Sequence, residues 1–157
     1  MSCQIEIRVQ EAEFDLGAVS RAISADRTDI GAIVTFSGLV RDFNEKPDVL
    51  ALTLEHYPGM TEQALQEIAQ DAVDRWPLQA VHVIHRVGRL TPGDSIVLVA
   101  VASAHRQAAF DGCSFIMDFL KTRAPFWKKE NTRQGDYWVS ARSSDAVAAG
   151  RWQEGDI

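Results

Sequence analysis

The chain has 157 residues, of which 46% are hydrophobic and 24% charged, and 16 lysines and arginines against 22 aspartates and glutamates give a formal net charge of −6. This size and composition predict one globular domain and exclude a disordered, fibrous or disulfide-stapled chain. The acidic balance argues against general nucleic-acid binding, which depends on a basic surface.

Neither a membrane anchor nor an export signal is apparent. The longest apolar stretch, residues 96–102, is far shorter than the ~20 residues that a membrane-spanning helix needs. Residues 1–6 have neither the basic nor the apolar region of a signal peptide. Cys3 and Cys113 lack the spacing of a zinc site, so we expect two free thiols and neither a metal nor a cofactor. We expect a cytoplasmic protein.

Alternating apolar and polar residues, and runs rich in Val and Ile, predict strands. Ile5, Ile7 and Val9, for example, alternate with polar residues in the first strand. The turn at residues 91–94 predicts a hairpin between the runs on either side, and the polar residues 41–48 predict a loop. The expected strands cover residues 5–9, 31–40, 49–57, 81–87, 95–102 and 137–139.

Apolar residues at helical spacing predict three helices, over residues 16–23, 61–76 and 106–123. Asp15 suits the start of the first helix, and Thr61 can cap the second. The third ends near Arg123 because Pro125 disfavours the α conformation of the residue before it. Together these elements predict one α+β domain over residues 1–152, with residues 153–157 as a frayed tail.

An uneven charge distribution gives the first functional indication. Residues 101–133 contain six basic and three acidic residues in an otherwise acidic chain, which suggests a local anion site, although a solvated basic face would give the same pattern. His105 and Arg106 open a helix, where an imidazole, a guanidinium and backbone N–H groups can bind one phosphate-like group. The alternative is an arginine that caps or pairs locally.

Two lysines are candidates for acid–base chemistry. Lys121 falls on one helical stripe with Phe110 and Met117, and partial burial is how a lysine is tuned towards a working base. Its alternative role is a favourable interaction with the negative end of the helix dipole. Lys128 follows two aromatic residues and can supply a second cation, or lie in a solvated turn beside core aromatics.

Several further residues stand at the ends of expected elements. Arg41 and His85 are in positions that suit a site, although His85 and His56 are better explained as structural histidines. Asp118 and Glu130 could orient the lysines. No P-loop, GxGxxG, HExxH or GxSxG motif occurs. The residues alone therefore indicate an anion pocket with a candidate acid–base lysine, and no particular reaction.

Three segments carry a resemblance to a known family. They are Thr-Leu-Glu-His-Tyr-Pro-Gly-Met at 53–60, Ser-Ala-His-Arg at 103–106 and Phe-Ile-Met-Asp-Phe-Leu-Lys-Thr-Arg-Ala-Pro-Phe-Trp-Lys-Lys-Glu at 115–130. With them the chain resembles the large, catalytic subunit of molybdopterin synthase from about residue 31 to residue 152. The resemblance implies an α/β hammerhead-like domain with an additional antiparallel β subdomain, and a dimer of large subunits with one small subunit at each end.

The resemblance also implies a reaction and its partners. The family installs two sulfurs as a dithiolene on cyclic pyranopterin monophosphate, in molybdenum cofactor biosynthesis. The sulfur arrives as a thiocarboxylate on the Gly-Gly tail of a small ubiquitin-like carrier subunit. An extended tail of the smallest residues can enter a narrow pocket, and this route needs no catalytic cysteine.

By the same resemblance, the site residues divide into three groups. Lys121 and Lys128 correspond to the two essential lysines. The substrate contacts are Arg41, His105 and Arg106, flanked by Leu39, Val40, Lys129 and Glu130. Arg142 corresponds to a residue that reaches the pocket from a second copy of the large subunit. Two alternatives stay open, namely a non-catalytic docking module for a ubiquitin-like carrier and a lyase that forms a Schiff base on Lys121.

Overall fold

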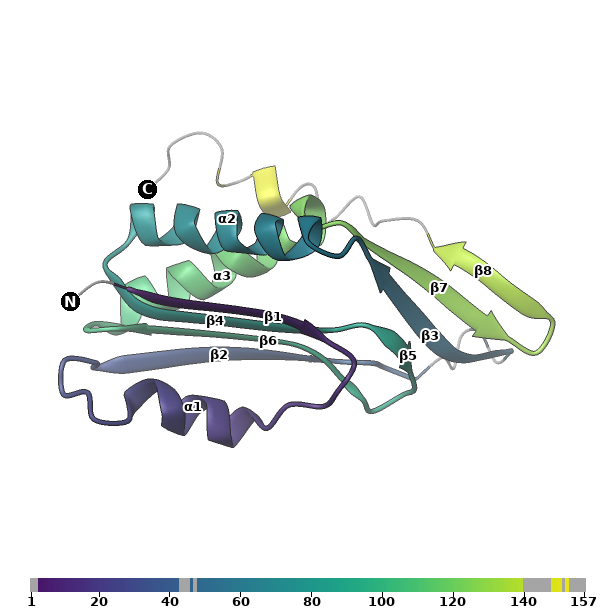
Figure 1. Ribbon diagram of the computed structural model, residues 1–157, viewed down its shortest axis with the longest axis horizontal. Helices are drawn as coiled ribbons and strands as arrows, with labels where there is room; N and C mark the ends of the chain where they lie inside the picture. Colours follow the sequence, from purple (N-terminus) through teal and green to yellow (C-terminus); the bar gives the residue numbers. More distant parts are fainter. Residues whose placement is uncertain (1–2, 43–45, 47, 140–147, 151, 153–157) are drawn as a thin grey trace.

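The computed structural model describes residues 3–42, 46, 48–139, 148–150 and 152, and arranges them as two four-stranded sheets with helices packed against the first (Figure 1). The elements in chain order are β1 (Gln4–Gln10), α1 (Leu16–Ser24), β2 (Ala32–Leu39), β3 (Val49–His56), α2 (Met60–Arg75), β4 (Leu78–Arg86), β5 (Gly88–Leu90), β6 (Ser95–Ser103), α3 (Arg106–Arg123), β7 (Phe126–Thr132) and β8 (Gly135–Val139).

The first sheet has the strand order β1-β4-β6-β2. β1 pairs with β4 in parallel, whereas β6 pairs antiparallel with both β4 and β2. The predicted pairing of the two runs around residues 91–94 is thereby confirmed. Helices α2 and α3 cover one face of this sheet and α1 covers the other (Figure 1).

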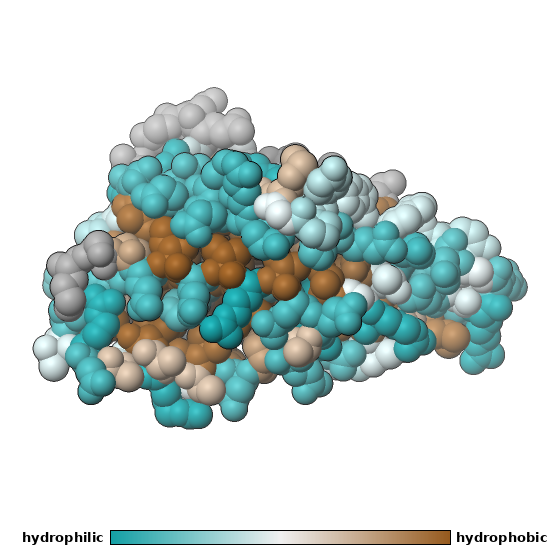
Figure 2. Space-filling model, viewed as in Figure 1, coloured by the Kyte–Doolittle hydropathy of each residue, from teal (hydrophilic) through white to brown (hydrophobic). Residues whose placement is uncertain are grey.

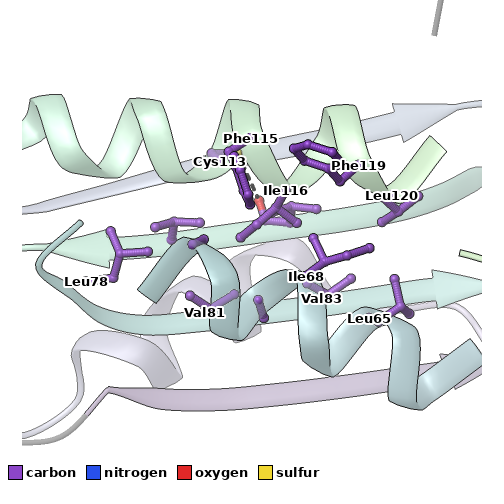
Figure 3. Close-up of a cluster of buried hydrophobic side chains, with 14 of the residues drawn as sticks. Leu65, Ile68, Leu78, Val81, Val83, Cys113, Phe115, Ile116, Phe119 and Leu120 are labelled. Carbon is purple, nitrogen blue, oxygen red and sulfur yellow. Dashed lines mark hydrogen bonds between the residues drawn. The ribbon is translucent and has the colours of Figure 1, made fainter. Parts of the chain in front are cut away.

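The alternation of side chains along β4 and β6 produces a core on each face of the first sheet. Val99 and Val101 face the larger core under α2 and α3, whereas Ala100 and Ala102 face α1. Leu65 and Ile68 of α2 meet Phe115 and Ile116 of α3 over β4 (Figure 3). Each fully buried side chain of this kind contributes roughly 1.5–3 kcal/mol to folding. Figure 2 shows the hydrophobic band between α2 and the sheet, with polar side chains on the outer surface of the helix.

The second sheet has the order β5-β3-β7-β8 and is antiparallel throughout. Figure 1 shows it extending away from the helices, beyond the ends of β2 and β4. Val40, Leu52, Leu54 and Leu90 form its small core, with Ile96 of β6 packed against them. This sheet is the additional antiparallel unit that the resemblance implies, and the α+β class is confirmed.

The differences from the sequence-based elements have local causes. The strand expected at 81–87 is present as β4 but ends at Arg86, because Gly88, at a φ of +87°, turns the chain into β5 of the other sheet. β7, which carries Lys128, was not among the expected strands. The predicted cap of α2 is wrong: Gly59 is the N-cap residue, its N–H donates to Glu62 Oε1 at 3.2 Å, and Thr61 has another function described below.

Some expectations fall outside the described residues, namely those for Arg142, for positions 43–45 and 47 of the 41–48 loop, and for the 153–157 tail. Within the part of the chain that is described, no helix is both long and apolar enough to span a bilayer. Cys3 and Cys113 are free thiols, as predicted. Burial raises the pKa of the Cys113 thiol to about 11, so it is protonated in the core at neutral pH.

Candidate functional site

The two candidate lysines stand on either side of the junction between α3 and β7. Lys121 lies in the last turn of α3 and Lys128 is the third residue of β7. The helix ends at Ala124, which adopts an extended conformation before Pro125, and the Phe126 N–H donates to the Ala124 carbonyl at 2.9 Å. Both lysine side chains are exposed. Among the described residues Lys121 forms no hydrogen bond or ion pair, so its ammonium is available to a ligand.

The buried hydroxyl of Thr61 links this junction to the turn between β3 and α2. Thr61 is fully buried, its Oγ1 donates to the Pro125 carbonyl at 3.3 Å, and the same oxygen accepts from the Tyr57 N–H at 3.0 Å. The segment at 53–60 and the segment at 115–130 are thus joined at Pro125. Sequence analysis missed this function of Thr61, because a buried Thr near a helix start has the same local pattern as a helix cap.

A buried histidine lies behind the junction. The His85 Nδ1–H donates to the Arg86 carbonyl at 2.8 Å, and the imidazole stacks on Phe126 with ring centroids 3.8 Å apart and planes 19° apart. Burial, opposed in part by the hydrogen bond to the Arg86 carbonyl and reinforced by smaller electrostatic effects of His56 and Lys121, lowers the pKa of His85 to about 4. His85 is therefore neutral at physiological pH and lies within electrostatic range of Lys121.

The neighbours of Lys128 in β7 are directed elsewhere. Successive side chains of a strand alternate between faces, so Lys129 lies on the face opposite to Lys128. Its Nζ is 3.5 Å from Glu55 Oε1 and 4.8 Å from the centre of the Trp138 ring. Glu130 accepts from Lys46 Nζ at 2.9 Å. Lys129 thus has its partners within the second sheet, and Glu130 has its partner in the segment before β3.

Arg41 lies at the same end of the first sheet as Lys121. β2 ends with Leu39 opposite Ser95, the first residue of β6, and α3 runs back over β6 towards that end (Figure 1). Arg41 and Leu39 are exposed. Val40 is buried among the leucines of the second sheet, and its N–H donates to the Asp94 carbonyl at 2.9 Å. Its side chain therefore anchors the segment and is not presented to solvent.

His105 and Arg106 lie at the opposite end of the first sheet. Arg106 precedes Lys121 by fifteen residues in one continuous helix, which at a rise of 1.5 Å per residue separates them by about 22 Å along the axis. This distance is too great for both side chains to contact one phosphate group in a single chain. Neither His105 nor Arg106 caps α3 through its side chain, so the local-cap alternative is not observed.

A close backbone contact holds the segment before His105. The Gly31 N–H donates to the Ser103 carbonyl at 3.0 Å, and a Cβ at Gly31 would lie only 2.1 Å from the Ala104 carbonyl oxygen. The Ser103 hydroxyl, itself buried, donates to the Pro77 carbonyl at 2.8 Å. Gly31 is required here because any side chain would displace the strand that leads to His105.

Other expectations for the site are only partly met. Phe110 is 57% exposed, so the apolar border expected around Lys121 is open in a single chain. Asp118 Oδ2 accepts a hydrogen bond from Trp152 Nε1 at 2.6 Å, which links α3 to the segment after β8. Arg86 donates to the Glu11 and Ser95 carbonyls at 3.0 and 3.1 Å and is structural.

Two cavities in the described part of the chain lie away from the lysines. One, of about 200 Å³, is lined by residues of β1, α1 and β4, including Glu6 and His82. Another, of about 280 Å³, lies beside Arg75, Phe115 and Trp152. Lys121 and Lys128 line neither of these cavities and stand on an open surface.

These features define a class of protein: an α+β domain with an added antiparallel sheet, whose candidate site is a pair of exposed lysines on a rigid junction, with arginines at the ends of the first sheet. Comparison with known proteins is consistent with this. Residues 9–123 match the family described as MoaE protein. The molybdopterin synthase catalytic subunit of Pseudomonas aeruginosa is 59% identical over 148 residues, covering 94% of this chain and 99% of the relative.

Solved structures agree. The structure described as molybdopterin biosynthesis MoaE protein from Burkholderia ambifaria has a TM-score of 0.82 at 52% identity and covers 95% of this chain and 98% of that one. A chain from a complex of subunits 1 and 2 of the molybdopterin-converting factor of Helicobacter pylori has a TM-score of 0.71 at 19% identity over 88% and 92% of the two chains, which shows a shared fold. The chain belongs to the MoaE family and has the role of a molybdopterin synthase catalytic subunit, a sulfur-transferring enzyme.

Proposed function

We propose that the chain transfers sulfur from the C-terminal thiocarboxylate of a small ubiquitin-like carrier to cyclic pyranopterin monophosphate, forming the molybdopterin dithiolene at Lys121 and Lys128. The observation that carries the assignment to this site is the α3–β7 junction, where both lysines are exposed on a segment fixed by Thr61 and Pro125. Each thiocarboxylate carries one sulfur, so two carrier molecules serve each product. A cytoplasmic location fits these partners.

Lys121 acts as the principal acid–base group and Lys128 assists it. Sulfur addition requires protons to be moved and negative charge to be stabilised on the pterin, and positioned ammonium groups do both. Arg41, on the same end of the sheet, is placed to bind the anionic precursor, since a guanidinium forms strong charge-assisted hydrogen bonds with phosphate. Leu39 flanks this contact, whereas Val40 supports it from the core.

His105 and Arg106 serve the same reaction from a second copy of the chain. The ~22 Å along α3 separates them from Lys121 of their own chain. In a two-fold dimer every contact occurs twice, so each copy can give its arginine to the lysines of the other. Arg142 is proposed to reach the pocket in the same way. The exposed Tyr137 and Trp138 of β8, at 56% and 60%, fit a surface covered by another chain.

The small carrier binds mainly by inserting its Gly-Gly tail beside the lysines. The Helicobacter pylori structure contains two different subunits of one factor, which supports a small partner for this chain. An extended tail without side chains loses little to steric conflict in a narrow site. Deleting the Gly-Gly end should weaken carrier binding by orders of magnitude in calorimetry, and unchanged affinity would show that the globular surfaces dominate.

The function is tested by incubating the purified protein with thiocarboxylated carrier and cyclic pyranopterin monophosphate and measuring dithiolene product. We expect product only when the carrier ends in a thiocarboxylate, with the carboxylate form of the same carrier as the control. Tight carrier binding without product would instead indicate a docking module. Trapping of a carbonyl substrate on Lys121 by borohydride would indicate a Schiff-base lyase.

A further inference from the structure

His85 is a buried imidazole next to the lysine pair, and the proposed chemistry does not use it. Its exposed fraction is 6%. Two of its contacts are specific: the 2.8 Å hydrogen bond from Nδ1–H to the Arg86 carbonyl, and the near-parallel stack on Phe126 at 3.8 Å. Through the stack, His85 contacts the first residue of β7, the strand that carries Lys128.

Phe126 connects His85 to the lysines. It is the first residue of β7, five residues after Lys121 and two before Lys128, and lies opposite His56 of β3. Residues two apart in a strand share a face, so Phe126 and Lys128 start from the same face of β7. The stack therefore places the His85 ring against the first residue of the strand that carries Lys128, next to the short segment 122–125 that follows Lys121.

We propose that His85 is a positioning residue for the lysine pair: its ring, anchored on the Arg86 carbonyl and stacked on Phe126, fixes the α3–β7 junction from which Lys121 and Lys128 project. The inference rests on the proposed roles of these two lysines. His85 does not contact substrate and acts only through Phe126.

The charge state of His85 suits this position. The titratable groups that act electrostatically on the ring are His56 and Lys121, and both oppose its protonation. The Arg86 guanidinium is occupied by the Glu11 and Ser95 carbonyls. With a pKa of about 4, His85 adds no second positive charge behind Lys121 at neutral pH. It fixes the junction without offering a carboxylate that would pair with the ammonium.

The test separates the stack from the hydrogen bond. His85→Asn keeps a donor for the Arg86 carbonyl and removes the ring, so we expect kcat to fall at least tenfold, with KM for the pterin and Kd for the carrier within about twofold of wild type. His85→Phe keeps an aromatic ring on Phe126, and we expect it to retain kcat within about threefold. His82→Asn is the matched control, because His82 is a buried histidine of the same strand that pairs with Glu6 beneath α1; its kcat should be unchanged.

Phe126→Leu provides the same test from the other side of the stack, should His85→Asn fail to fold. It should lower kcat as His85→Asn does, and the double variant should lose little more than either single variant, because both remove one contact. Equal losses in His85→Phe and His85→Asn, or a wild-type kcat in both His85→Asn and Phe126→Leu, would overturn the inference. Lys121→Ala, assayed in parallel, separates the two claims: if it is inactive while the His85 variants are normal, only the positioning role fails.

Discussion

A site assembled from two copies of the chain predicts that two inactive variants restore each other. Lys121→Ala removes the principal acid–base group, and Arg106→Ala removes a precursor contact about 22 Å away on the same helix. If Arg106 serves the partner's Lys121, a dimer containing one chain of each kind has one site with both lesions and one site with neither.

The size of the recovery follows from counting sites. Random association of equal amounts of the two variants makes about half of the dimers mixed, and each mixed dimer has one intact site, so about a quarter of all sites regain wild-type composition. The lysine variant should retain at most about 1% of the rate. Arg106→Ala should lose about tenfold or more at subsaturating precursor, since a hydrogen bond to a charged group contributes roughly 1.5–3 kcal/mol.

The assay is dithiolene formation by co-expressed variants, with the two proteins carrying different affinity tags so that mixed dimers can be purified. Purified mixed dimers should reach about half of the wild-type rate. Lys121→Ala co-expressed with Lys128→Ala is the control, because these residues share one junction and both mixed sites keep a lesion. A rate no higher than the mean of the two parent variants would refute the two-copy site, as would a monomer in light scattering at micromolar concentration.

Three further outcomes are expected. Arg106→Ala should weaken precursor binding by roughly 1.5–3 kcal/mol in calorimetry while the fold persists; unchanged affinity together with loss of folding would show that Arg106 is structural. Gly31→Ala should lower thermal stability and precursor affinity together, because its Cβ would lie 2.1 Å from the Ala104 carbonyl oxygen; unchanged values of both would contradict the close contact. The free energy of unfolding should fall by up to roughly 3 kcal/mol as the pH drops from about 6.5 to about 4, because the pKa of His85 is about 4 in the fold and higher in the unfolded chain, which therefore binds the proton first. Chemical denaturation of His85→Phe should show a weaker dependence of the unfolding free energy on pH over this range. An unaltered dependence would show that another group titrates there.

Much of the first sheet and its helices could be predicted from sequence because burial imposes a periodic pattern. The apolar positions Ala109, Cys113, Ile116 and Leu120 of α3 all lie in buried positions, and Pro125 ends the helix where expected. β7 was not recognised as a strand, because its polar segment from Lys128 to Thr132 is buried on neither face and is held by backbone pairing with β3 and β8.

The candidate site was predicted less completely, because its geometry depends on contacts between distant segments. Lys121 and Lys128 could be named from the sequence, but Thr61 and His85 act through Pro125 and Phe126, and these contacts have no local signature. The separation of Arg106 from Lys121 could have been calculated from the expected length of the third helix alone. It is this length that suggests a second copy of the chain in the site.

The most direct test of the account compares Lys121→Ala with Lys129→Ala in dithiolene formation from thiocarboxylated carrier and precursor. A lysine at a helix end contributes only about 0.3–1 kcal/mol to stability, so Lys121→Ala should keep its fold and its carrier affinity and lose at least roughly a hundredfold in rate. Lys129 is directed towards Glu55 and Trp138, and its alanine variant should retain most of the activity. Equal losses would show that general positive charge matters and not a positioned proton-transfer group, and wild-type turnover by Lys121→Ala would contradict the account.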